Sequence, residues 1–311
     1  MRPGRSAGVA VFGALAVAAG AAALRRRPPR RSDKWPGREA TVAAARRLNR
    51  AAGLIATSTL LDSGVEHYRG AFHNRAMVIP LVVSALALAV SAHGTRDERK
   101  TAHRVRDSIY AAAALTGVVG TGFHVCNIGK RPGGFCWQNL FYGSPLGAPA
   151  AVALAGLLGY YSERLRDSEG WATPRVFGMP AGRALAALTA AGLVATSGEA
   201  GLLHFRGAYH DPFMFVPVTV PPIAAVLLAE TAATHPHRPR RLTRWWLRLT
   251  ALTGFLGAGF HVFGVSRNMG GWRNWSQNIL NGPPIPAPPS FTGLALAGLA
   301  ALGLIEEHPR A

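Results

Sequence analysis

The sequence predicts an all-α, polytopic integral membrane protein with eight transmembrane helices in two parallel four-helix repeats, plus an N-terminal hydrophobic helix. Three observations predict this fold. Hydrophobic residues make up 49% of the 311 residues and are gathered into blocks. The basic residues lie between the blocks and are abundant in every second loop. The second half of the chain also repeats motifs of the first half at a fixed spacing.

The apolar blocks have the length of membrane spans. A bilayer core needs about 20 mostly apolar residues per helix, and charged residues are only 16% of this chain, against roughly a quarter in soluble proteins. The weakest block is the first, because it is short and ends with Asp62 and Glu66. The predicted spans are 51–67, 76–93, 109–129, 146–161, 184–204, 213–234, 247–265 and 290–305.

Residues 7–24 form a further apolar stretch that opens the chain. Arg2 and Arg5 precede it and small residues end it, as in a signal peptide. Five arginines follow within 25–31, and such a run resists translocation. We therefore expect an uncleaved membrane helix, or a peripheral one, that ends at the cytoplasmic face.

The basic residues predict the orientation. Lys and Arg number 34 against 15 Asp and Glu, and alternate loops hold 23 and 7 of the basic residues. The positive-inside rule places the Arg-rich loops in the cytoplasm and the protein in the plasma or inner membrane. A nucleic-acid-binding protein needs a continuous basic face on a soluble domain. Here the charge lies only between apolar blocks, so we expect membrane lipid, and no nucleic acid, as a partner.

The chain is predicted to be an internal duplication. Segment 67–80 matches 204–217 at seven of 14 positions, and 115–125 matches 252–262 at eight of 11, both at an offset of 137. A third match has an offset of 139, so the second copy carries a two-residue insertion. An even number of spans gives both copies the same orientation. The predicted units are an N-terminal segment (1–37), a first repeat (38–166), a cytoplasmic linker (167–181) and a second repeat (182–311).

Three histidines in each copy are predicted to meet at the extracytoplasmic end of the helices. Neutral imidazole is the commonest metal ligand, and a histidine in an apolar setting needs a partner. Three imidazoles and a carboxylate would suit zinc, copper or iron, whereas two opposed imidazoles would suit a b-type haem. The alternative is a purely structural role, in which the imidazole rings form hydrogen bonds only with loop carbonyls and lipid headgroups. The candidate ligands are His67, His73, His124 and Asp62 in the first copy, and His204, His210, His261 and Glu199 in the second.

Other repeated residues surround these histidines. Arg69 and Arg206 would balance the charge of a propionate or an anionic intermediate, or pair with Asp62 and Glu199. The pairs Gln138-Asn139 and Gln277-Asn278 would bind a headgroup or hold the loop as a lid. Two glycine runs would let a flat ring approach the backbone, or would be close helix contacts. These runs are Gly117, Gly120 and Gly122, and Gly254, Gly257 and Gly259.

Two pairs of residues have two interpretations each. Asp62 and Glu199 lie within spans, where ionisable groups are costly and indicate function, unless each pairs with the nearby arginine. Cys126 and Cys136 occur only in the first copy, on the predicted outer side, and would form a disulfide there or remain free thiols.

Three functions remain open. The first is a redox membrane subunit that binds haem b or a transition metal and exchanges electrons with quinone or an extracytoplasmic partner. The second is a transporter of ions or small molecules built from parallel repeats. The third is a non-catalytic anchor for a partner complex. No nucleotide-binding, metalloprotease or serine-hydrolase motif supports a standard hydrolase or ATP-driven activity. We favour the redox subunit, because the polar groups gather at one end and not at mid-membrane.

Overall fold

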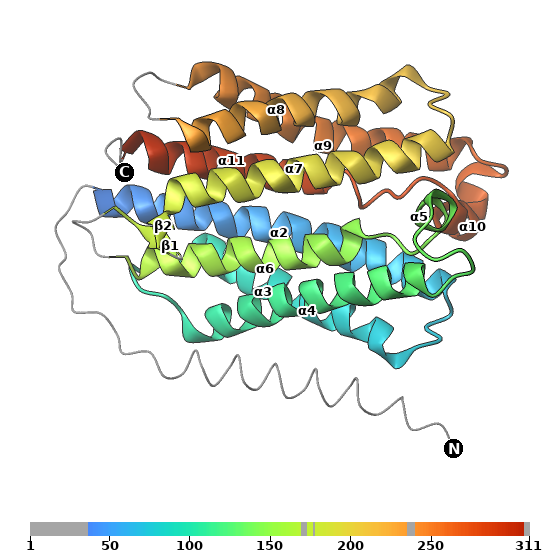
Figure 1. Ribbon diagram of the computed structural model, residues 1–311, viewed down its shortest axis with the longest axis horizontal. Coiled ribbons are helices and arrows are strands. Elements are labelled where there is room, and N and C mark those ends of the chain that lie inside the picture. Colours follow the sequence, from blue (N-terminus) through green and yellow to red (C-terminus); the bar gives the residue numbers. More distant parts are fainter. Residues whose placement is uncertain (1–36, 169–172, 177, 235–239, 308–311) are drawn as a thin grey trace.

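A computed structural model describes residues 37–168, 173–176, 178–234 and 240–307. The predicted hydrophobic segment 7–24 lies outside this range. The all-α prediction is confirmed: the described residues form helices, apart from loops and one hairpin of two-residue strands, β1 (Arg175–Val176) and β2 (Met179–Pro180), within the predicted linker. The helices lie side by side along the long axis (Figure 1).

The helices of 18 residues or more all fall on predicted spans. They are α2 (Gly37–Arg69), α3 (Ile79–Arg96), α4 (Arg104–Gly129), α6 (Gly147–Arg166), α7 (Ala181–Arg206), α8 (Val216–Ala233), α9 (Arg241–Arg267) and α11 (Pro289–Glu307). Short helices occupy the loops: η1 (Arg75–Val78), α5 (Trp137–Phe141), η2 (Pro212–Phe215), η3 (Gly271–Asn274) and α10 (Trp275–Asn281).

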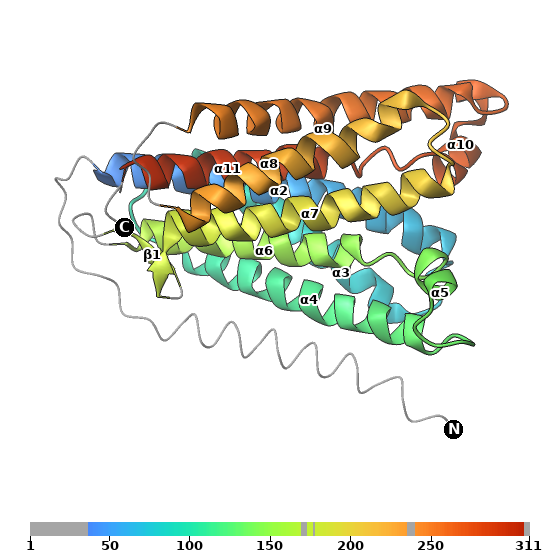
Figure 2. The same cartoon turned by 45° about the horizontal axis from the view of Figure 1, so that its top comes forward.

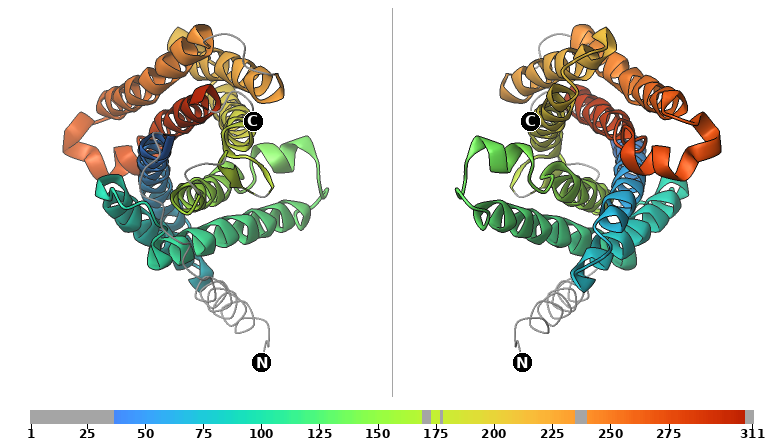
Figure 3. Two further views of the ribbon diagram at one scale, coloured as in Figure 1. Left: turned by 90° about the vertical axis from the view of Figure 1, so that its left-hand side faces the viewer. Right: turned by 90° about the vertical axis from the view of Figure 1, so that its right-hand side faces the viewer.

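The long helices form an inner group and two outer pairs. Viewed along the long axis, α2, α6, α7 and α11 lie in the middle (Figure 3). The outer pair α3 and α4 packs on α2 and α6, and the outer pair α8 and α9 packs on α7 and α11. Turning the molecule shows α5 and α10 together at one end, which we name the histidine end, and the β1–β2 hairpin at the other, which we name the arginine end (Figure 2).

Six helices are long and apolar enough to cross a membrane among the described residues: α3 with η1, α4, α7, α8, α9 and α11. In the outer four, only 17–22% of the most apolar stretch is buried inside the protein. Exposed apolar side chains such as Val82, Val118 and Phe255 are costly in water but suit lipid. The chain is therefore a multi-span membrane protein.

The other two long helices, α2 and α6, are less apolar because they lie inside. Helix α2 packs on α3, α6 and α11, and α6 packs on α2 and α4. Neighbouring helices shield buried polar side chains of these two helices from lipid. In α6 these side chains include Glu163 and Arg166.

Candidate functional site

The first two histidines of each half are held by one repeated turn. Nδ1 of His67 lies 2.7 Å from the Met77 carbonyl oxygen, and Nδ1 of His204 lies 2.8 Å from that of Met214. Each ring therefore ties the end of one helix to the start of the next. A carbonyl only accepts, so Nδ1 must carry the proton in both rings.

This turn has an unusual backbone. Ala71 and Phe72 have φ of 53° and 45°, and Ala208 and Tyr209 have φ of 56° and 47°. Residues other than glycine rarely adopt this left-handed conformation, and two in succession are rarer still. Backbone hydrogen bonds hold it, with the N–H of Phe72 donating to the His67 carbonyl at 3.0 Å and that of Tyr209 to the His204 carbonyl at 3.1 Å. Strain of this kind gathers at functional sites.

The remaining four histidines are fixed in the same manner. Nδ1 of His124 lies 2.5 Å from the Pro145 oxygen, and Nδ1 of His261 lies 2.7 Å from the Pro284 oxygen. Nδ1 of His73 and of His210 each lies 3.0 Å from a glycine oxygen of the turn, Gly70 and Gly207. In all six rings Nδ1 therefore donates to a backbone carbonyl, and Nε2 has no hydrogen-bond partner among the described residues. Metal-bound histidines are oriented by the same kind of bond.

The structure brings some of the predicted ligands together. His67 interacts electrostatically with His124 and His73, and His204 interacts with His261. Among the described residues, however, no group of three His, Cys, Asp or Glu side chains is arranged to hold a metal ion. The predicted three-histidine site is therefore not visible, and His73 and His210 lie on the exposed turn. The structure shows only pairs of rings.

The two glycine runs are mainly helix contacts. A Cβ on Gly117 would collide with the backbone of Ala153, and one on Gly254 would collide with Thr292. Gly120 and Gly257 face Pro149 and Pro288 in the same way. These four glycines let α4 approach α6 and α9 approach α11. The third glycine of each run, Gly122 and Gly259, has no described atom within 4 Å of such a Cβ.

The predicted cofactor-binding side chains have other partners. Nη1 of Arg69 lies 2.7 Å from Oε1 of Glu66, and the guanidinium of Arg206 lies 5.1 Å from the centre of the Phe141 ring. Asn139 donates to the carbonyls of Pro132 and Gly134 at 2.9 and 2.8 Å, and so holds its loop.

The second half repeats this loop contact. Asn278 donates to the carbonyls of Met269 and Gly271 at 3.2 and 2.8 Å. Gln138 and Gln277 are exposed. Within each predicted Gln-Asn pair, the asparagine therefore shapes the loop, and the glutamine remains at the surface.

The two carboxylates of the spans lie near each other. Helices α2 and α7 are diagonally opposite in the inner group (Figure 3), and Asp62 of α2 interacts electrostatically with Glu199 of α7. Glu199 lies against Gly147, the first residue of α6, where a side chain would collide with its Oε2 atom. The equivalent of Gly147 is Pro286, which has no backbone N–H. The two carboxylates therefore have different surroundings.

The two cysteines are free and exposed. The predicted disulfide is absent from the described residues, so that interpretation is corrected. Cys126 lies in the last turn of α4, and Cys136 caps the short helix α5. Both cysteines therefore lie at the histidine end of the molecule.

A buried ionic network at the arginine end was not predicted. The side chains of Arg106 and Glu163 are 0% exposed, and Nε of Arg106 donates to Oε1 of Glu163 at 2.8 Å. Nη1 of Arg106 also donates to Asp97 at 2.7 Å. Arg166 is 1% exposed and donates to the carbonyls of Gly94, Asp97 and Arg99.

The network continues into the protein through neutral groups. Nδ2 of Asn49 donates to the hydroxyl oxygens of Tyr110 and Ser162 at 2.9 and 2.7 Å. Tyr110 and Ser91 share a hydrogen bond of 3.0 Å. One signal in the sequence could have revealed the network: the second half has alanine or leucine where the first has Asn49, Tyr110 and Glu163.

The network shifts the pKa values of two side chains in the α3–α4 loop, Asp97 and His103. Burial alone would raise the pKa of Asp97, but the Arg99 N–H and the Arg106 guanidinium together hold that pKa below its usual value. Burial, Arg106 and His93 all lower the pKa of His103. Nδ1 of His103 is buried without a hydrogen-bond partner among the described residues. The network therefore keeps Asp97 charged and His103 neutral.

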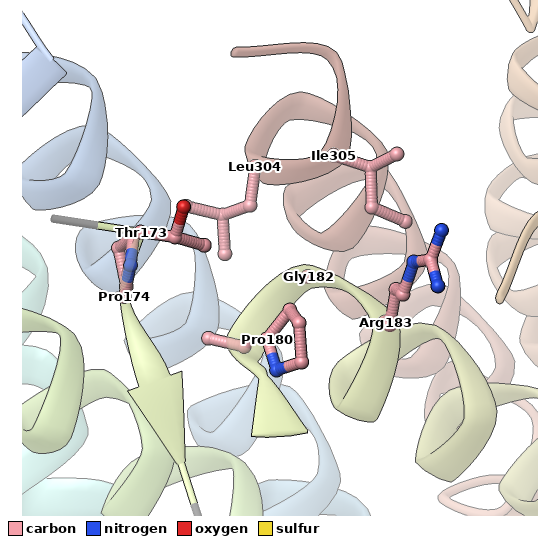
Figure 4. Close-up of a pocket in the computed structure, with 8 residues that line it drawn as sticks. Thr173, Pro174, Pro180, Gly182, Arg183, Leu304 and Ile305 are labelled. Atoms are coloured by element: carbon pink, nitrogen blue, oxygen red, sulfur yellow. The ribbon is translucent and has the colours of Figure 1, made fainter. Parts of the chain in front are cut away.

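A small recess also lies at the arginine end (Figure 4). Its walls come from residues 173–174, the start of α7 at 180–183, and Leu304 and Ile305 of α11. Arg183 is the only charged side chain that lines it. The recess lies at the opposite end from the histidines and contributes nothing to their site.

Comparison with protein-family models, curated proteins and solved structures finds no match to this chain.

Proposed function

We propose that this membrane protein binds a redox cofactor at its histidine end and transfers electrons to or from quinone or an extracytoplasmic partner. One observation carries the proposal. In both halves equivalent backbone carbonyls hold Nδ1 of the histidines and leave Nε2 without a partner among the described residues, although the two halves differ at most of their apolar positions.

The pairs His67–His124 and His204–His261 favour a haem over a metal ion. Each pair interacts electrostatically, whereas a set of three ligands is not found among the described residues. Two imidazoles would suffice to hold a haem iron, whereas zinc sites in proteins have three or four protein ligands. Beside His67, a Cβ on Gly64 would meet no described atom within 4 Å, so the space one turn below the ring is open.

The proposed membrane arrangement has eight spans. All the long helices run along one axis (Figure 1), so a bilayer that α3 and α4 cross is also crossed by α2 and α6. This arrangement makes 38–166 and 182–311 parallel repeats and places the loops after α3 and α6 in the cytoplasm. Reporter fusions at Lys100, Phe141 and Asn281 test it. A cytoplasmic signal at Lys100 and periplasmic signals at the other two are expected, and any other combination contradicts it.

A second candidate function is transport. Its support is the pair Asp62 and Glu199, which lie on diagonally opposite inner helices and interact electrostatically. Carboxylates at such a position bind protons or cations in many transporters. Flux into proteoliposomes that disappears in both Asp62→Asn and Glu199→Gln would support this function and oppose the redox proposal.

The decisive experiment is an absorption spectrum with elemental analysis of the detergent-purified protein. We expect a Soret band with about two haems per chain. His124→Ala and His261→Ala should each remove about half of the band, because each deletes one axial ligand. His73→Ala, on the exposed turn, is the matched control and should keep the band. Protein without haem and without stoichiometric iron, copper or zinc contradicts the proposal and leaves a transporter or a structural anchor.

A further inference from the structure

One face of α9 combines two arginines with an exposed tryptophan. Arg241, Trp245, Arg248 and Leu252 are spaced by four, three and four residues, so they share one helix face. All four are exposed, with Trp245 55% and Leu252 50% exposed. Helix α9 is one of the six candidate membrane spans, so this face lies toward lipid.

The two arginines have no anionic partner within the described chain. No salt bridge joins Arg241 or Arg248 to a carboxylate of the described residues, whereas Arg244 of the same helix pairs with Glu306. The adjoining segment 235–239 contains no Asp or Glu. Both guanidinium groups are therefore available to an anionic group from outside the described chain.

Arg248 lies at the start of the predicted membrane span 247–265. It is seven residues beyond Arg241, which corresponds to about 10 Å along the helix axis. A guanidinium facing hydrocarbon at that depth is costly. Side chains of a helix lean toward its N-terminus, so Arg248 extends back toward the start of α9 and the level of Trp245 and Arg241. Tryptophan prefers the same interfacial level.

We propose that Arg241, Trp245 and Arg248 form a binding site for the phosphate of an anionic phospholipid. Two guanidinium groups bind a phosphodiester through charge-assisted hydrogen bonds, and the indole packs beside the glycerol backbone. The ligand belongs to the lipid leaflet at the arginine end. The site does not depend on the proposed redox function, since it lies at the other end of the molecule.

The first half provides a matched control. Arg104 of α4 is equivalent to Arg241 and is also exposed, but Ser108 and Ala111 stand where α9 has Trp245 and Arg248. Helix α4 therefore has one surface cation without the second arginine or the tryptophan. It tests whether the arrangement on α9, and not the mere presence of an arginine, binds lipid.

Native mass spectrometry of the full chain with added phosphatidylglycerol or phosphatidylcholine tests the site. We expect the wild type to retain one phosphatidylglycerol in preference to phosphatidylcholine. Each arginine near an anionic surface contributes about a fivefold change in affinity, so the double variant Arg241→Gln/Arg248→Gln should bind about 25-fold more weakly. Arg104→Gln should keep the retained lipid.

A gain of binding sharpens the test. The variant Ser108→Trp/Ala111→Arg copies the α9 face onto α4 and should retain a second phosphatidylglycerol. The proposal is overturned if the α9 double variant binds as the wild type does, if Arg104→Gln loses the lipid equally, or if phosphatidylcholine is retained as well. Circular dichroism of each variant confirms that it is folded, since all these positions are exposed or part-exposed.

Discussion

The two halves of the chain agree at the histidine end and differ at the arginine end. At the histidine end, all three histidines of each half bond to equivalent carbonyls. At the arginine end, the buried ionic network lies only in the first half, as far as the described residues extend. The helices nevertheless pack alike: Gly159 of α6 lies against Tyr110, and Gly298 of α11 lies against its equivalent, Leu247.

This difference shows that the helix packing does not require the network. Where the first half buries Arg106, Glu163 and Arg166, the second half has Thr243, Leu302 and Ile305. Apolar residues are often as stabilising as a buried ion pair, but a pair that loses one partner is strongly destabilised. The network is thus a specific feature of the first half, where it ties α4 and α6 to the α3–α4 loop, while the histidine turn is common to both halves.

The largest expected effect comes from breaking the network. Glu163→Leu copies Leu302 but leaves Arg106 and Arg166 buried without their carboxylate, so the free energy of unfolding should fall by roughly 3–5 kcal/mol. Denaturation in detergent, followed by circular dichroism, measures the loss. Glu98→Ala is the control, because Glu98 is 78% exposed in its pair with Arg46 and should matter little.

A second variant sharpens this prediction. Arg106→Thr, Glu163→Leu and Arg166→Ile together with Asp97→Thr import the residues of the second half and leave no buried charge alone. This variant should be more stable than Glu163→Leu by itself. If it is equally unstable, the first half needs the network for packing and the comparison of the halves fails.

Helix contact glycines should behave alike in both halves. Gly117→Ala and Gly254→Ala each place a Cβ against the facing helix, so each should lower the free energy of unfolding by about 1–3 kcal/mol. Gly122→Ala and Gly259→Ala enter open space and should not be destabilising. Unfolding in detergent measures all four. A loss confined to one half would mean that the halves pack differently.

Acid should destabilise the arginine end. The pKa values of Asp97 and His103 are both lowered, so their stabilisation is present above the unfolded-state pKa and is lost as the pH falls through the folded value. The melting temperature should therefore begin to fall below about pH 6.5 through His103, and fall further below about pH 4 through Asp97. His103→Gln should flatten the first step. An unchanged pH profile in His103→Gln contradicts the assignment.

The smallest expected effect concerns the strained turn. Glycine adopts positive φ without penalty, so Ala71→Gly and Ala208→Gly should each raise the free energy of unfolding by up to about 1 kcal/mol. Ala43→Gly, at an exposed position inside α2, should lower it by a similar amount. Thermal unfolding compares the three. If Ala71→Gly and Ala208→Gly instead lower the free energy of unfolding, the alanine methyl groups stabilise the fold by more than the backbone strain destabilises it.

Much of the fold was predictable because hydrophobic patterning acts locally. The long helices coincide with the predicted spans, and six are apolar enough to be confirmed by composition. The positions of the histidines at one end of the helices were predicted. What the structure shows of their role is the alternative interpretation, in which Nδ1 of each ring forms a hydrogen bond with a backbone carbonyl. Of the two interpretations of Cys126 and Cys136, the structure shows the free thiols, and sequence spacing alone could not decide between them because a disulfide needs a specific geometry.

Sequence alone determined the all-α membrane character, the apolar segments that become helices and the repeated motifs. The length of an apolar segment and the residue identity between two segments can be read along the chain without three-dimensional information. Only the tertiary structure decided that α2 and α6 lie inside, that Arg106 meets Glu163 across 57 positions, and that the described residues place no third metal ligand beside the ring pairs. The physical reason is that burial and hydrogen bonding depend on which helices become neighbours, and packing between distant segments settles this.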